Sequence, residues 1–228
     1  MTVDLLELAA AALDDLLEEV VFVGGATLTV WITDPAAQPP RPTKDVDVVV
    51  EVTTRGGFYA FEGRLRERGF KEDQESGIIC RWQHRDTGLI LDAMPADASI
   101  LGFENRWQAE ALPFAAEREL PSGSRIRAIP PPYLLATKLE AFKGRGKGDF
   151  VGSADFADIV ALVDGREELV PEVHTAGSQL RRYVSKELQR LRSHSRFLDG
   201  VYGAFPPDAA SQARADEVVL PRLDLLVD

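Results

Sequence analysis

The sequence contains few of the residues that build disulfide, zinc and thiol sites. It has one cysteine, Cys80, and three histidines among 228 residues. One cysteine cannot form an internal disulfide, which is consistent with a reducing compartment, and the histidines lack the spacing of zinc ligands. Cys80 follows two isoleucines in an apolar stretch, which predicts a buried structural role rather than a nucleophile. The sequence therefore supports neither a disulfide framework nor a histidine-based metal site.

Long apolar runs and an excess of positive charge are also missing. No stretch approaches the roughly 20 apolar residues that span a bilayer, and the first residues, Met-Thr-Val-Asp, lack the basic start of a signal peptide. The formal net charge of -11 opposes binding along a nucleic acid, because phosphates are bound by a positive surface. We therefore expect a cytoplasmic protein with no membrane partner, whose contacts with any RNA are local.

Hydrophobic residues make up 45% of the chain, which is enough for a core, and they follow clear periods. Apolar residues recur every three or four positions in some segments and at every second position in others, as in helices and strands respectively. The elements expected in the first 130 residues are helices at 5–20, 26–32 and 58–68 and strands at 20–23, 45–52, 77–82, 89–94 and 125–129.

Three consecutive prolines at 130–132 mark the expected domain boundary, because proline breaks regular structure and then favours the start of a helix. The predicted domains are residues 1–130 and 131–228. Beyond the prolines the apolar spacing is helical, with helices expected at 133–143, 153–163 and 179–198 and one more in the tail. The expected fold class is α/β (α+β), with a mixed sheet flanked by helices and followed by a C-terminal helical domain.

Two aspartates, Asp45 and Asp47, lie on one face of the strand expected at 45–52. Neighbouring carboxylates repel each other unless a proton or a cation neutralises them, and oxygen ligands suit Mg²⁺ or Mn²⁺. Asp92, on another expected strand, supplies a third acid that completes a metal site of Asp45, Asp47 and Asp92. Alone, the Asp-x-Asp pattern is weak, because exposed acids at strand ends are common.

A glycine pair, Gly24-Gly25, stands where a strand passes to a helix. Its backbone N–H groups can approach a phosphate closely, and Thr27 is the nearest hydroxyl. Taken by itself, the glycine pair favours an ordinary tight turn. The glycine turn and the acids together make a nucleotide site the stronger interpretation.

This order of strand, glycine turn, helix and three aspartates resembles the nucleotidyltransferase superfamily of polymerase-beta-like folds. More narrowly it is similar to the AbiEii/AbiGii toxin group, over about residues 20–165. The similarity extends to Thr137-Lys138-Leu139-Glu140-Ala141, to the basic segment from Lys143 to Asp149, and to Asp155-Phe156-Ala157-Asp158-Ile159. The superfamily often has serine after the turn glycine, where this chain has Ala26, so a reduced phosphate affinity is expected.

The resemblance implies that Lys138 contacts nucleotide phosphates and that Asp158, with Asp155, supports the site. Without the resemblance, the preferred interpretation of Lys138 is an ordinary solvated lysine on a helix surface. The expected active site, in a cleft between the two domains, thus comprises catalytic Asp45, Asp47, Asp92, Lys138 and Asp158, with Gly24, Gly25, Thr27 and Lys138 contacting the nucleotide.

The implied function is metal-dependent transfer of a nucleoside monophosphate from a nucleoside triphosphate to an acceptor. The most specific version is a toxin that modifies tRNA in a toxin–antitoxin or phage-defence system, with a cognate antitoxin as a partner. The candidate RNA contacts are Lys143, Arg145, Lys147, Arg182, Lys186 and Arg190. Two alternatives stay open: an aminoglycoside-type nucleotidyltransferase for small molecules, and a non-catalytic nucleotide-binding or partner-binding module.

Overall fold

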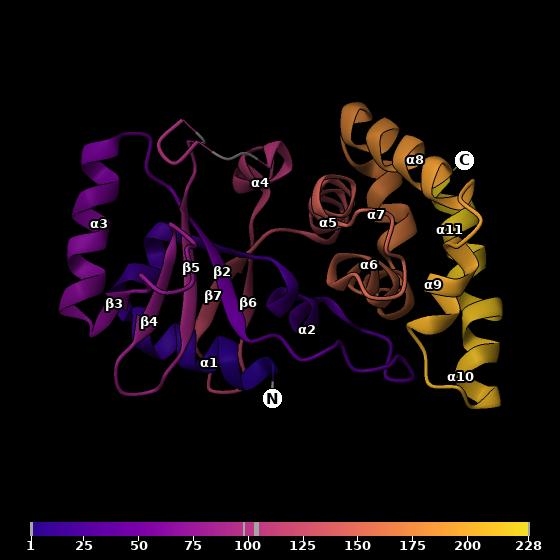
Figure 1. Ribbon diagram of the computed structural model, residues 1–228, viewed down its shortest axis with the longest axis horizontal. Coiled ribbons are helices and arrows are strands. Elements are labelled where there is room, and N and C mark those ends of the chain that lie inside the picture. The colour runs from indigo at the N-terminus through magenta and orange to yellow at the C-terminus, as the bar shows by residue number, and fades with distance from the viewer. Residues whose placement is uncertain (1, 98, 103–104, 228) are drawn as a thin grey trace. The chain divides into compact units, whose positions relative to one another are not determined.

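A computed structural model describes residues 2–97, 99–102 and 105–227 of the chain, without the side chains of residues 2 and 3 (Figure 1). The chain divides into two compact units. One comprises Met1–Val30 and Pro42–Pro130, and the other comprises Trp31–Arg41 and Pro131–Asp228. Among the described residues, no helix is both long and apolar enough to cross a membrane.

Within the described part of the first unit, seven strands form one mixed sheet. They are β1 (Val20–Val23), β2 (Asp45–Val50), β3 (Phe70–Glu72), β4 (Arg81–His84), β5 (Ile90–Pro95), β6 (Ala116–Glu119) and β7 (Arg125–Ala128). The strand order is β3-β4-β5-β2-β1-β7-β6. The pairs β2–β5 and β1–β7 are parallel, and the other neighbours are antiparallel. The expected mixed sheet flanked by helices is confirmed.

The central strands follow directly from the apolar sequence. All four residues of β1 are buried. In β2, half-buried and buried residues alternate from Asp45 to Val48, and all residues from Val48 to Val50 are buried. Such continuous apolar runs are typical of strands covered on both sides. In β2, Val46 and Val48 face the core while Asp45 and Asp47 occupy the other face and are only half-buried.

The helices of this unit differ in places from the expected ones. Here α1 (Thr2–Leu13) ends earlier than expected, because Asp14 has a positive φ of 50° and a 3₁₀ helix continues from Asp14 to Glu19. The expected helix at 26–32 is a 3₁₀ turn, Gly25–Thr27, followed by the short α2 (Leu28–Trp31). The helix expected at 58–68 is confirmed as α3 (Arg55–Glu67), which lies beside β3 in Figure 1, and a short α4 (Arg106–Ala111) follows β5.

The structure contains two strands that were not expected from the sequence, and one of the expected strands is shorter. Both β3 and β6 are short, and their exposed positions are charged, so they carry little apolar signal. The strand expected from residue 77 begins only at Arg81. Before it, Ile78 and Ile79 lie in an exposed loop despite their apolar side chains.

The second unit is helical after the prolines, as expected. It contains α5 (Pro131–Arg145), α6 (Ala154–Gly165), α7 (Leu169–Thr175), α8 (Ser178–Arg192), α9 (Phe197–Gly203), α10 (Ala209–Arg214), a π-helical turn (Ala215–Val219) and α11 (Leu220–Val227). Prolines occupy the first positions of α5, where a missing N–H costs nothing. The single helix expected at 179–198 is instead α8 and α9. Phe142, Phe150 and Phe156 form an aromatic core, with ring centroids 4.9–5.3 Å apart.

Residues 31–41 belong to this second unit, although the sequence analysis assigned every residue up to 130 to the first domain. Polar contacts with distant residues hold the segment there. The N–H groups of Thr33 and Asp34 both donate to the carbonyl oxygen of Gly165, at 2.8 and 3.0 Å. Arg214 bridges Asp34 and Asp164. Local sequence gives no sign of these partners.

Candidate active site

The sheet brings the three expected acids to one place in the first unit. Asp45 and Asp47 lie on β2, which pairs in parallel with β5 so that Asp47 is in register with Asp92. Residues in register on neighbouring strands point to the same face. Asp92 is buried, whereas the side chain of Asp45 is 34% exposed. The acid cluster, meaning Asp45, Asp47 and Asp92, is therefore partly open to solvent.

The glycine turn lies directly against this acid cluster. Gly24 follows β1, whose last residue, Val23, is in register with Asp47. Its φ of +74° suits glycine, and a Cβ added there would meet Asp47 Oδ2 at 2.0 Å. The turn and Asp47 thus fit together only because residue 24 has no side chain.

Thr27 supports the turn from inside. Its side chain is fully buried, and its Oγ1 donates to the carbonyl oxygen of Gly24 at 2.8 Å. Thr27 was expected to contact the nucleotide as the hydroxyl nearest to the turn; its hydroxyl is instead turned inward to fix the backbone of Gly24, and a contact with phosphate stays a prediction. A phosphate at this turn would meet backbone groups.

Arg81, which the sequence analysis missed, binds two of the three acids. It lies on β4 in register with Asp92. Its Nε and Nη2 donate to Asp92 Oδ1 and Oδ2 at 2.8 and 2.7 Å, and Nη2 also donates to Asp45 Oδ2 at 2.7 Å. The hydrogen bonds to Asp92, together with the charges of Asp45 and Asp47, raise the pKa of Arg81 above its usual range. The guanidinium is therefore permanently charged.

This contact corrects one expectation from the sequence. Repulsion between bare carboxylates predicts strain when no metal is bound, but Arg81 already places a positive charge between Asp45 and Asp92. Within the described residues, no three or more His, Cys, Asp or Glu side chains are arranged to hold a metal ion. The oxygen donors have the right chemistry for Mg²⁺ or Mn²⁺, but the guanidinium of Arg81 occupies both oxygens of Asp92 and one of Asp45.

Neither a scan of protein-family models nor a search of curated proteins gave a match to this chain. Its function is therefore inferred from its own residues.

Cys80, next to Arg81, is buried as expected. Burial, followed by the negative charges of Asp92 and Asp47, raises the pKa of its thiol to about 12. A thiol that stays protonated at neutral pH is a poor nucleophile. Cys80 is therefore a packing residue that senses the negative potential of the acid cluster.

The second unit contains another charged group, which we name the buried ion-pair cluster after its buried carboxylates: Asp155, Asp158 and Lys138, which are buried, with the half-buried Arg41 and the exposed Arg145. Lys138 Nζ on α5 lies 2.7 Å from Asp158 Oδ2 and 3.3 Å from Asp155 Oδ1 on α6. Arg41 forks onto Asp158, and Arg145 forks onto Asp155. The cluster ties the proline-rich segment to both helices.

The expected position of Lys138 on a helix surface was wrong. Its side chain is only 8% exposed, because two carboxylates on α6 draw it inward. Burial opposes ionisation of Asp155, but the hydrogen bonds from Arg145 and the charge of Lys138 outweigh it and lower the pKa of this carboxyl. Contact between Lys138 and a phosphate stays a prediction, whereas its role in joining α5 to α6 is visible. Arg41 was not among the site residues expected from the sequence.

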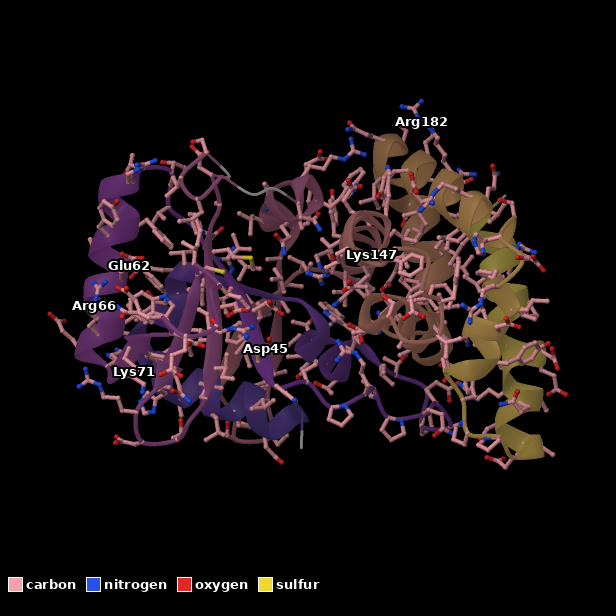
Figure 2. The ribbon with its side chains drawn as sticks, in the orientation of Figure 1. Asp45, Glu62, Arg66, Lys71, Lys147 and Arg182 are labelled. Carbon is pink, nitrogen blue, oxygen red and sulfur yellow. The ribbon has the colours of Figure 1, made fainter. Side chains whose placement is uncertain are left out.

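The six candidate RNA contacts fall into two groups. Lys143 and Arg190 both bind the buried carboxylate of Glu187, and Arg145 binds Asp155. Lys143 and Arg145 also lie in the last turn of α5, which ends at Arg145 rather than at the expected residue 143. The other three, Lys147, Arg182 and Lys186, are exposed and make no ion pair with a described carboxylate, and Arg182 projects away from α8 (Figure 2).

Proposed function

We propose that this protein is a cytoplasmic, metal-dependent nucleotidyltransferase that uses Asp45, Asp47 and Asp92. One observation supports the proposal above all: the Gly24 backbone packs against Asp47, whose strand neighbour in register is Asp92. A glycine turn that gives access to phosphates and a group of carboxylates that attracts a cation therefore meet at one end of the sheet. Transfer of a phosphate-linked group can use both features, because backbone N–H groups can face the phosphates while a bound cation offsets their charge.

The three acids differ in exposure, and we assign them different roles on this basis. Asp45 and Asp47 lie on the more open side and would hold the cation that accompanies the triphosphate. Asp92, which is more buried, would hold a second cation or accept the proton of the acceptor hydroxyl. When bound, Mg²⁺ or Mn²⁺ would supply charge stabilisation to the phosphates. The acceptor oxygen bonds to the α-phosphorus as the bond from that phosphorus to the bridging oxygen breaks, and pyrophosphate leaves.

The acceptor that we propose is RNA, with tRNA as the most specific case. Lys147, Arg182 and Lys186 are exposed cations, and cations of this kind provide local contacts to phosphates on a chain that is acidic as a whole. The assignment to a toxin of a toxin–antitoxin or phage-defence system rests on the family resemblance alone. Modification of a small molecule, as in aminoglycoside-type transferases, uses the same acids without the cations.

Arg81 supports a second candidate function, a non-catalytic nucleotide-binding or partner-binding module. In such a protein the guanidinium would permanently replace the metal on Asp45 and Asp92. The Gly25-Ala26 sequence, which lacks the serine common at this turn, points the same way. The two functions differ in whether pyrophosphate is released.

An incubation with each labelled nucleoside triphosphate, Mg²⁺ and total RNA tests the proposal. We expect label on RNA, and we expect Asp47→Asn to reduce it at least about a hundredfold, because a charge-stabilising group is lost from the site. Asp86→Asn is the matched control, since Asp86 is exposed in the turn between β4 and β5. Equal labelling by both variants would remove Asp47 from the site. Saturable nucleotide binding without pyrophosphate release would favour the binding module.

A further inference from the structure

The guanidinium of Arg81 uses the same oxygen atoms that a cation would need. Both oxygens of Asp92 and one oxygen of Asp45 accept its hydrogen bonds, at 2.7–2.8 Å. Its side chain is 16% exposed, so these bonds are largely shielded from water. Hydrogen bonds between two charged groups are among the strongest in proteins, and shielding strengthens them further. Arg81 is thus a firmly held cation within the acid cluster.

A divalent ion cannot simply be added to this arrangement. Mg²⁺ binds oxygen at about 2.1 Å and repels a guanidinium held on the same carboxylates. The backbone of Arg81 is fixed by pairing with β5, but its long side chain has several rotatable bonds. Replacement of the guanidinium by a divalent ion therefore requires rotation of the Arg81 side chain and no rearrangement of the sheet.

We propose that Arg81 is the resident cation of the acid cluster. Divalent ions bind the carboxylates of Asp45 and Asp92 only when the guanidinium leaves these carboxylates. The inference rests on the proposed function for the identity of the site. In the metal-free protein Arg81 keeps the carboxylates together without strain. The same contact lowers the affinity for metal, so the site stays closed at low concentrations of divalent ion.

Direct binding of Mn²⁺, followed by the paramagnetic resonance signal of the free ion, tests the competition without measuring activity. The proteins are wild type, Arg81→Gln and Arg85→Gln. The last is the matched control, because it makes the same charge change at an exposed arginine in the neighbouring turn. We expect Arg81→Gln to bind Mn²⁺ at least about tenfold more tightly than wild type, since each charged hydrogen bond that need not be broken contributes about this factor. Arg85→Gln should bind like wild type.

The outcomes separate this inference from the proposed function. If wild type binds Mn²⁺ and Arg81→Gln binds it no more tightly, Arg81 does not compete, and the metal site itself stands. If neither protein binds Mn²⁺ but both are folded, the metal site is wrong and the inference fails with it. If only Arg81→Gln binds, the competition is stronger than expected and the inference is supported.

A measurement on wild type covers the case in which Arg81→Gln does not fold. The Nε–H of Arg81 donates to Asp92 and should exchange slowly with solvent in the metal-free protein. Its ¹⁵N resonance is assigned by its absence in Arg81→Lys, which keeps the charge. We expect saturating Mg²⁺ to bring this N–H into fast exchange. Unchanged protection at full occupancy by metal would overturn the inference.

Discussion

The acid cluster and the buried ion-pair cluster use the same kinds of side chain in opposite proportions. The first contains three carboxylates and Arg81, whereas the second contains Asp155 and Asp158 with three cations. The exposed fraction of the side chain is 34% at Asp45 and 1% at Asp158. An accessible cluster with excess negative charge can take up a cation. A cluster whose buried carboxylates are matched by cations instead joins structural elements to one another.

The largest effect that would test this contrast is expected for Lys138→Ala. Removing one partner from a buried ion pair leaves carboxylates without part of their charge compensation, and such changes cost about 3 kcal/mol or more. In this mutant Arg41 still binds Asp158 and Arg145 still binds Asp155. The loss of stability should therefore stay near this value. Urea unfolding measures it. Lys186→Ala, which removes an exposed lysine from α8, is the control and should change stability by less than about 0.5 kcal/mol.

The dependence of the free energy of unfolding on pH, measured at acid pH, gives a second test of the same mutant. Because the pKa of Asp155 is lowered in the folded protein, its contribution is present above the unfolded pKa near 3.8 and is lost as pH falls through the folded value. Lys138→Ala reduces this lowering, so its acid unfolding should begin at higher pH than that of wild type. A mutant as stable as Lys186→Ala across this range would make the buried ion-pair cluster energetically unimportant.

Gly24→Ala should have the next largest effect, because it affects the acid cluster through the backbone. Alanine at a φ of +74° is strained, and its Cβ would also lie 2.0 Å from Asp47 Oδ2. Gly88 has a similar φ of +70° with no atom near an added Cβ, so Gly88→Ala reports the strain alone. The strain costs about 1 kcal/mol or more at each position. Thermal unfolding should show Gly24→Ala to be clearly the less stable variant, and equal losses would show that Asp47 moves aside freely.

The sequence predicted the parts of the molecule that local apolar patterns control. Strands β1 and β2 and helix α3 follow from their own residues, and so does the convergence of Asp45 and Asp47 on one face. Arg81 was missed because an arginine in a hairpin is usually solvated. Counting equally from both ends of a turn at 84–88 would pair Arg81 with Leu91, whereas the observed register pairs it with Asp92, so the sequence alone did not predict this contact.

Burial of charged residues was the least predictable feature. The position of Lys138 depends on Asp155 and Asp158, which lie on the next helix of the chain, and the position of Arg41 depends on Asp158, more than a hundred residues later. No local period carries such information. The short, charged strands β3 and β6 were missed for a related reason, since neighbouring strands rather than their own apolar residues hold them in place.

A smaller effect is expected for Asp45→Asn in the metal-free protein. Repulsion alone predicts that removing one of three carboxylates stabilises the protein. Because Asp45 accepts a hydrogen bond from Arg81 at 2.7 Å, the loss of its charge should instead destabilise the fold by about 1 kcal/mol. Unfolding in the presence of a chelator measures the change. A stabilised mutant would show that repulsion outweighs the bridge, and the acid cluster would then be strained when empty.

The smallest effect concerns Cys80, whose thiol reports on the acid cluster from within the core. Burial raises its pKa most, and the charges of Asp92 and Asp47 add to this, taking it from an ordinary 9.0 to about 12. A raised folded pKa stabilises the protein below pH 9, and this contribution is lost as pH rises towards 12.

Asp47→Asn removes one of the two charges but none of the burial. The pKa of Cys80 should therefore fall by about one unit or less, and alkylation by iodoacetamide at pH 8 should speed up by no more than about tenfold. Asp86→Asn should leave the rate unchanged. An Asp47→Asn protein that reacts like wild type would place the charge of Asp47 too far from Cys80 to matter, and the excess negative charge that separates the acid cluster from the buried ion-pair cluster would then be smaller than its carboxylates suggest.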